Sequence, residues 1–191
     1  MPETDNETNS IANLISQFSR TWTLLLQYDE DRLTRPKALH PTSKALDYQQ
    51  ATKAITLLKN ELIKCGEAGD LFGLQRDQHL QGILGNIYQT FDSKELYPSA
   101  EEKAASLLYF VIKDHPFSDG NKRIGCFLFL LFLEENGLLG KSGINDNGLV
   151  TLALLIAESD PRQKDLLIRL VLSLLVSKIE NHRGHNEILC S

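Results

Sequence analysis

The sequence predicts an all-α fold with one short β-hairpin. Apolar residues recur at spacings of three and four along most of the chain, which is the period of helices that bury one face. Capping residues, glycines and prolines separate these stretches, as they do at helix ends. Residues 91–98 lack a helical period and are the one stretch near residues 115–123 that is expected to be extended.

The expected helices follow in chain order, and the residues at their ends help to define them. The apolar period predicts helices over residues 11–26, 41–66, 80–88, 99–112, 121–135, 149–157 and 161–175. Asn9 or Ser10 can cap the first of them. Gly66 or Gly69 ends the second, and residues 71–79 are expected to form a polar loop.

The fourth of these helices has the clearest boundaries. Ser99 and Glu102 form a capping box, in which each side chain accepts a hydrogen bond from the other residue's otherwise unpaired amide. Pro116 ends the helix, because a residue that precedes proline is pushed out of the α region. Asn136 followed by Gly137 ends the next helix.

The chain length and the residues that interrupt the helical pattern indicate one compact domain with an extension at each end. A chain of 191 residues is long enough to bury a single core. We place an N-terminal helix and leader in residues 1–35, the main domain in residues 36–181, and a polar tail in residues 182–191.

The composition argues against several classes of protein. The net charge of −5 leaves no basic surplus to neutralise phosphates, which disfavours a nucleic-acid binder. Three scattered cysteines suit neither a disulfide framework nor a zinc site, and they indicate reduced thiols in a cytoplasm. The N-terminus is polar and acidic and shows no signal peptide. The longest apolar run, residues 124–133, is about half of the roughly 20 residues that cross a bilayer, so we expect no membrane contact.

The stretch 115–123, with the sequence HPFSDGNKR, gathers several chemically active groups between two apolar helices. His115 has the ordinary pKa best suited to general base catalysis near neutrality. Asp119 is a hard oxygen ligand of the kind that magnesium prefers. The start of the following helix favours anions, and Lys122 and Arg123 add positive charge there. This combination indicates phosphoryl or nucleotidyl transfer.

Each of these residues also has a purely structural explanation. Asp119 and Asn121 are common in turns and helix caps. Gly120 can serve only the backbone conformation, Lys122 can point into solvent, and Phe117 is expected in the core. The remaining histidines show no metal-ligand spacing and are expected in solvent: His40, His79, His182 and His185.

The same stretch carries a family resemblance. Residues 115–123 resemble the signature loop of the Fic/Doc (Fido) family, H-P-F-x-D/E-G-N-G/K-R, and we call them the signature loop. The surrounding sequence is most similar to Doc-like toxins and to the Fic part of RhuM-like virulence proteins. Residues 92–98 resemble the family's flap, a hairpin that holds a target segment. The resemblance implies a Fic-type helical domain whose target docks on Glu95, Leu96, Tyr97 and Pro98.

The resemblance also implies an activity, that of a protein adenylyltransferase which uses ATP and Mg²⁺. His115 would accept the proton of a Ser, Thr or Tyr hydroxyl on a target protein, and Asp119 would hold the metal. The nucleotide would contact Ser118, Gly120, Asn121, Lys122 and Arg123. Doc-like kinases share the lysine at position 122, so transfer of the γ-phosphate is an alternative function. A non-catalytic binding module is a third.

Regulation is the last property that the resemblance addresses. Many Fic proteins carry an inhibitory helix with the pattern [S/T]-x-x-x-E-[G/N]. In this chain no glutamate follows any serine or threonine at that spacing, and Gly125 stands where the second arginine of a longer signature would pair with it. We therefore expect that no glutamate of this chain switches it off. Control would come from a separate antitoxin-like protein, from homo-oligomerisation or from a domain outside this sequence, and an unregulated chain is the alternative.

Overall fold

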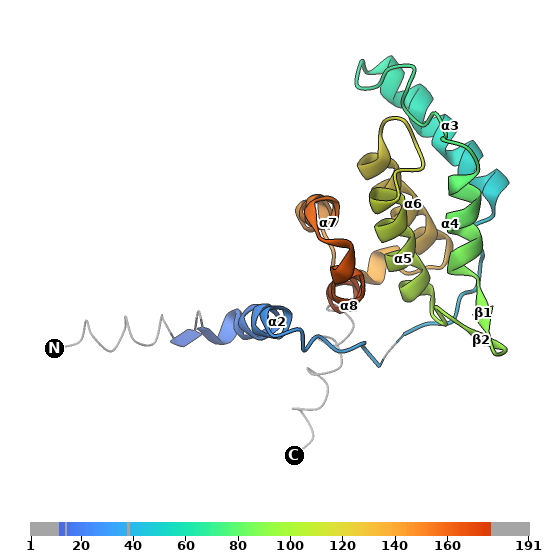
Figure 1. Ribbon diagram of the computed structural model, residues 1–191. Helices are drawn as coiled ribbons and strands as arrows, with labels where there is room; N and C mark the ends of the chain where they lie inside the picture. Colours follow the sequence, from blue (N-terminus) through green and yellow to red (C-terminus); the bar gives the residue numbers. More distant parts are fainter. Residues whose placement is uncertain (1–11, 14, 38, 177–191) are drawn as a thin grey trace. The chain divides into compact units, whose positions relative to one another are not determined.

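The computed structural model describes residues 12–13, 15–37 and 39–176, and it divides the chain into two units, residues 1–34 and 35–191. The first unit contains the helix α2 (Ser19–Asp29; Figure 1). Several of its apolar side chains are exposed, among them Trp22 and Leu25. The predicted cap of this region at Asn9 or Ser10 lies outside the described residues. The predicted division into domains remains a prediction.

The second unit is helical apart from one hairpin, which confirms the predicted fold class (Figure 1). Its α-helices and strands are α3 (Tyr48–Lys64), α4 (His79–Ile87), β1 (Thr90–Phe91), β2 (Lys94–Glu95), α5 (Ala100–Lys113), α6 (Asn121–Glu135), α7 (Asp146–Glu158) and α8 (Lys164–Leu175). Two short 3₁₀ turns, η1 (Leu139–Lys141) and η2 (Pro161–Gln163), follow α6 and α7. None of the helices in the described part of the chain combines the length and apolarity that a bilayer crossing requires.

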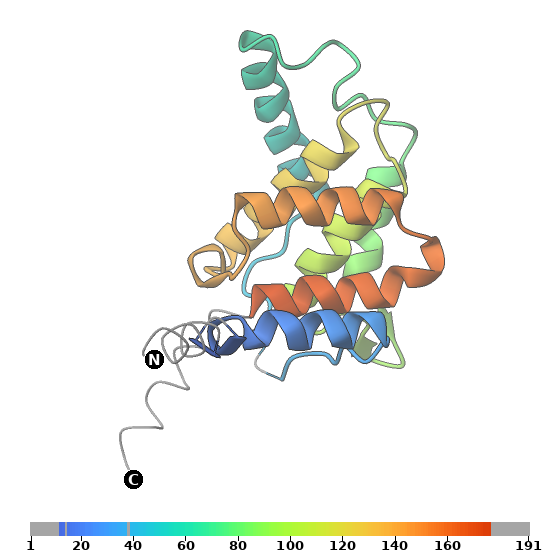
Figure 2. The ribbon, with the colours of Figure 1, turned by 90° about the vertical axis from the view of Figure 1, so that its left-hand side faces the viewer.

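Helix α5 is the centre of this unit. It packs against α4, α6, α7 and α8, and nearly all of its residues are buried. Figure 2 shows α7 and α8 as an antiparallel pair. The predicted capping box at the start of α5 is confirmed, since the Ser99 side chain accepts from the Glu102 amide and the Glu102 side chain accepts from the Ser99 amide. The fixed position of α5 determines where the segments at its two ends lie.

Helix α3 begins later than the sequence predicts. It starts at Tyr48 rather than near Ser43, because a second capping box forms there. The Asp47 carboxylate accepts from the Gln50 amide at 2.7 Å, and the Gln50 side chain accepts from the Asp47 amide at 3.2 Å. This box stabilises the helix start at Tyr48.

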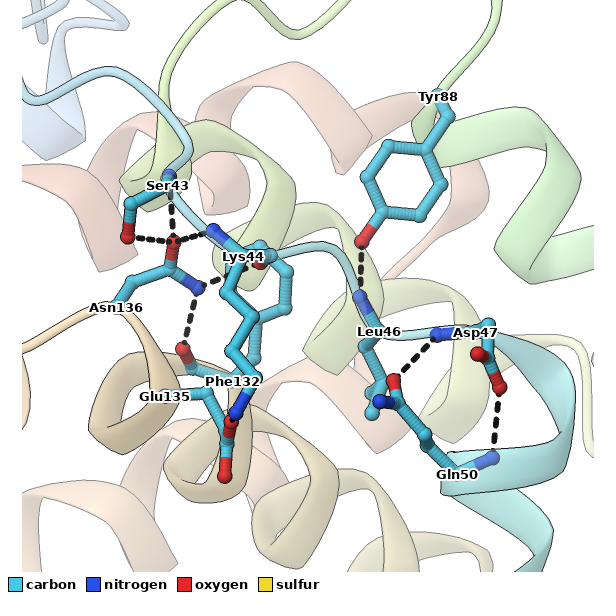
Figure 3. A network of polar contacts seen from close by, with 9 residues as sticks. All are labelled: Ser43, Lys44, Leu46, Asp47, Gln50, Tyr88, Phe132, Glu135 and Asn136. Atoms are coloured by element: carbon cyan, nitrogen blue, oxygen red, sulfur yellow. Dashed lines mark hydrogen bonds and ion pairs between the residues drawn. The ribbon is translucent and has the colours of Figure 1, made fainter.

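Residues 43–46, predicted as helix, are instead non-helical and are held by two distant side chains (Figure 3). The Asn136 side-chain oxygen accepts from the amides of Ser43 and Lys44 at 2.9 and 3.0 Å, and its nitrogen donates to the Lys44 carbonyl. The Tyr88 hydroxyl accepts from the Leu46 amide at 2.7 Å. These bonds replace the intrahelical bonds that the segment would otherwise make.

The predicted extended stretch, residues 91–98, overlaps the hairpin of β1 and β2, which spans residues 90–95. Thr90 pairs with Glu95, and Phe91 pairs with Lys94. The two turn residues between the strands, at positions 92 and 93, both have positive φ, as a tight hairpin turn requires. The hairpin leads directly into the first turn of α5.

Candidate functional site

The signature loop connects the end of α5 to the start of α6. Helix α5 ends at Lys113, and His115 adopts a left-handed backbone conformation with φ +48. This conformation is uncommon in residues with a Cβ and costs about 1 kcal/mol. The His115 side chain is exposed, while Pro116 and Phe117 beside it are buried. Strained residues of this kind cluster at functional sites, which agrees with the predicted role of His115.

Asn121 closes the signature loop from its buried side. Its side-chain oxygen accepts from the Phe117 amide at 2.9 Å, and its side-chain nitrogen donates to the Phe117 carbonyl at 2.8 Å. Both residues are buried, and Phe117 is entirely so. Because the Asn121 carboxamide is used within the protein, a contact between this residue and a nucleotide would come from its backbone amide.

Gly120 caps α6 in a conformation that favours glycine, with φ +88. The Asp119 carboxylate accepts from the Gly120 amide at 2.7 Å, and the first intrahelical bond runs from the Ile124 amide to the Gly120 carbonyl. The amides of residues 121–123 therefore have no intrahelical partner. Together with the helix dipole, they provide the anion-binding position that the sequence predicts.

Residues 67–78, which we call the strap, run beside the signature loop. The Gly73 amide donates to the Asp119 carbonyl at 3.1 Å, and the Ser118 amide donates to the Leu74 carbonyl at 2.8 Å. The Arg76 amide donates to the Pro116 carbonyl at 2.8 Å. Three backbone bonds thus join the strap to the loop along its length. These bonds hold the backbone of the signature loop, which is only nine residues long.

Arg123 is held by the strap and by the loop itself. Its guanidinium donates to the Glu67 carbonyl at 2.7 Å, and its carbon lies 4.6 Å from the centre of the Phe72 ring. A second guanidinium nitrogen is 3.7 Å from the Asp119 carboxylate. The Arg123 side chain is still 46% exposed, so part of its guanidinium group remains accessible to a ligand. Lys122 is exposed beside it.

A cavity of about 710 Å³ lies along α4 and reaches Asp114, the residue before His115. Its lining residues are Asp77, Gln78, His79, Gly82, Ile83, Asn86 and Asp114. Partial burial raises the pKa of the Asp114 carboxyl, and the charges of His79, His115 and Lys164 offset part of that rise. The end of the loop at α6 thus carries the cations Lys122 and Arg123. The cavity along α4 is instead lined by two acids, Asp77 and Asp114.

Asp119 fits the predicted metal-binding role in part. Its carboxylate is about half exposed, and it can offer oxygen to an ion. Among the described residues, no group of three or more His, Cys, Asp and Glu side chains is placed to hold a metal. Magnesium commonly binds through one or two carboxylates together with substrate phosphates and water. Asp119 could hold such an ion only together with a bound nucleotide.

The structure brings the predicted base, metal ligand and phosphate contacts together, but not the predicted docking residues. Glu95 pairs with Lys103 in the first turn of α5, whereas the signature loop follows the last turn (Figure 1). A helix of this length separates its ends by about 20 Å. Tyr97 is also buried. The predicted docking on Glu95, Leu96, Tyr97 and Pro98 therefore lies at the opposite end of α5 from His115.

Sequence reasoning missed the strap, because residues 71–79 were expected to be a polar loop. Phe72 is instead fully buried, and residues 73–76 pair with the signature loop. The one signal in the sequence is the apolar run Leu71, Phe72 and Leu74 around Gly73. A short apolar cluster in a connection suggests that the connection packs against something, but it does not reveal the partner.

The comparisons with known proteins agree with this geometry. The model of the Fic/DOC family matches residues 45–133, a segment that contains the strap, the hairpin, α5, the signature loop and most of α6. A comparison with curated proteins finds no match. Through residues 45–133, the chain belongs to the Fic/DOC family.

Proposed function

We propose that this protein is an adenylyltransferase that transfers AMP from Mg-ATP to a Ser, Thr or Tyr hydroxyl of a target protein in the cytoplasm. One observation carries the proposal. An exposed histidine, held in a left-handed conformation, lies in the same short loop as a helix start with free amides, a carboxylate and an arginine. General base, metal ligand and anion site are the groups that this chemistry needs.

The nucleotide phosphates would lie at the cationic end of the loop. The amides of residues 121–123 would donate to phosphate oxygens, and Arg123 can add a charge-assisted pair from its exposed side. Lys122 and the Ser118 side chain are the remaining proposed contacts. A bound Mg²⁺, held by Asp119, would neutralise part of the phosphate charge.

The acceptor would approach His115 from the opposite side. The cavity along α4 is lined by Asp77 and Asp114 and is therefore unfavourable for phosphates, but it is open to a protein side chain. His115 would accept the hydroxyl proton as the oxygen attacks the α-phosphorus. The bond from that phosphorus to the bridging oxygen breaks, and pyrophosphate leaves with the electron pair. A target would need to extend about 20 Å from the loop to reach the hairpin as well.

The alternative function is that of a kinase, which the lysine at position 122 favours. The same base would then direct the hydroxyl to the γ-phosphorus, and ADP would leave. ATP labelled at either the α- or the γ-phosphate separates the two reactions in a lysate from which candidate targets can be identified. Transfer of the α-label supports the adenylyltransferase, and transfer of the γ-label supports the kinase instead. Transfer of neither label indicates a binding module or an inhibited state.

We further propose that control comes from a separate antitoxin-like protein or from homo-oligomerisation, because the chain contains no inhibitory motif. Expression in a bacterial host tests this directly. Toxicity that requires His115 and is relieved by a co-expressed neighbouring gene product would support the separate partner. Toxicity that no such product relieves would count against it.

A further inference from the structure

Phe72 is the point at which the strap contacts the two phosphate-binding parts of the signature loop. Its side chain is fully buried. The ring lies against Gly120, where the free amides of α6 begin, and under the guanidinium of Arg123. Within residues 67–78, all of which the structure describes, no other side chain is buried.

The contact with Gly120 leaves no space for a side chain at that position. A Cβ built on Gly120 would lie 2.4 Å from the nearest carbon of the Phe72 ring, a distance that real contacts do not show. The ring therefore supports the peptide that leads into α6. Because packed interiors transmit small displacements, the direction of the first amides of α6 depends on this support.

The contact with Arg123 is electrostatic as well as steric. A guanidinium 4.6 Å from a ring centre is attracted by the negative face of the ring. Two further groups hold the plane of the Arg123 guanidinium. They are the Glu67 carbonyl, 2.7 Å from one guanidinium nitrogen, and the Asp119 carboxylate. A flexible side chain held in this way loses less entropy when it binds a phosphate.

We propose that Phe72 is a positioning residue for the nucleotide, which holds the Arg123 guanidinium and the amides after Gly120 in the arrangement that binds phosphate. The inference rests on the proposed function, and it concerns a residue outside the signature loop. Since the Phe72 side chain is fully buried, it does not touch the nucleotide itself. Its effect passes entirely through the groups it contacts.

The test compares Phe72→Leu with Phe129→Leu, titrating each with Mg-ATP and with pyrophosphate by calorimetry. Phe129 is also fully buried and lies in α6, so it controls for the loss of an aromatic ring from the core. Phe72→Leu is expected to weaken the binding of both ligands about tenfold, whereas Phe129→Leu leaves it unchanged.

A spectroscopic measurement separates positioning from general damage. The side-chain NH signal of Arg123 should be shifted by the ring current of Phe72 in the parent protein, and Phe72→Leu should remove this shift. In an Arg123→Ala background, Phe72→Leu should weaken binding less than in the parent protein, because the part of its effect that passes through Arg123 is already lost. If Phe72→Leu does not fold, Phe72→Met, which keeps a flexible apolar side chain of similar size, replaces it.

The outcomes are distinct. Unchanged nucleotide and pyrophosphate affinity in a folded Phe72→Leu protein would overturn the inference while leaving the proposed function intact. An equal loss in Phe129→Leu would also overturn it, because the effect would then be one of stability. A parent protein that binds neither ligand would refute the proposed function, and the inference with it.

Discussion

The two ends of α5 both carry clustered charges, yet the charges are held in opposite ways. At the N-terminal end, Glu101, Glu102 and Lys103 are consecutive, and each is at most 3% exposed. All three are paired with residues outside α5. The partners are the His40 ring at 2.6 Å from Glu101, Arg35 at 2.8 Å from Glu102, and Glu95 at 2.8 Å from Lys103. His40, predicted to lie in solvent, is 39% exposed, and its ring pairs with Glu101.

At the C-terminal end the charged groups are exposed, and backbone geometry places them. His115 and Lys122 are exposed beside buried neighbours, and Asp119 and Arg123 are each about half exposed. The strap and the Asn121 carboxamide hold the chain that carries them.

The contrast separates structural from functional charge. A buried charge must be paired, because leaving water is costly, and once paired it has no capacity left for a ligand. An exposed charge on a rigid backbone keeps that capacity. By this criterion the hairpin end of α5 maintains the fold, and the signature-loop end is the candidate site. The following predictions test the division.

His115→Ala should have the largest effect on transfer and almost none on stability. A general base contributes about 10²–10⁴-fold to the rate, and an exposed imidazole contributes little to packing. Initial rates with labelled ATP and a thermal melt of the same sample measure both quantities. Near-normal transfer by the folded variant would remove His115 from the proposed role.

Gly120→Ala should lower the free energy of unfolding by about 3 kcal/mol, because the residue has positive φ and its Cβ would collide with the Phe72 ring. Gly137→Ala is the matched control, since Gly137 also has positive φ but nothing within 4 Å of a Cβ. It should lose only the backbone term of about 1 kcal/mol. Chemical denaturation of both variants gives the difference, and equal losses would contradict the close contact.

Glu95→Gln should lower the free energy of unfolding by about 2 kcal/mol, because it leaves the buried Lys103 ammonium without a countercharge. The Tyr97 carbonyl, 2.6 Å from the ammonium, limits the loss. The Leu96 amide, which donates to Gln89 across the hairpin, should exchange faster. Glu61→Gln, at an exposed pair with Lys64, is the control and should change stability by less than about 0.5 kcal/mol. Equal effects of the two variants would argue against the buried pair.

The two described cysteines should show the smallest effect, a difference in reactivity. Burial raises the pKa of the Cys126 thiol to about 11, while Cys65 is exposed. At neutral pH, alkylation followed by site-resolved mass spectrometry should label Cys65 and spare Cys126. Since the folded state retains the Cys126 proton, its contribution to stability should be constant below about pH 9 and fall between about pH 9 and 11. Rapid labelling of Cys126 in the native protein would show that the start of α6 opens.

Local signals were sufficient for several features of this protein. The Ser99 and Glu102 capping box, the end of α5 before Pro116 and the proline at the start of the 3₁₀ turn η2, which leads into α8, all depend on residues within one or two turns of each other. The signature loop is likewise a continuous stretch, so its residues were found without knowledge of the fold. Such features are determined by the sequence alone, because the interacting groups are neighbours along the chain.

Other features were decided only by the tertiary structure. No local pattern in the sequence predicts three of these features. They are the contact of Phe72 with Gly120 and Arg123, the pairing of Lys103 with Glu95, and the position of the hairpin far from His115. The later start of α3 belongs with them, because residues 43–46 are held by distant side chains. A helix period shows which face of a segment is buried, but the folded chain alone decides what covers it.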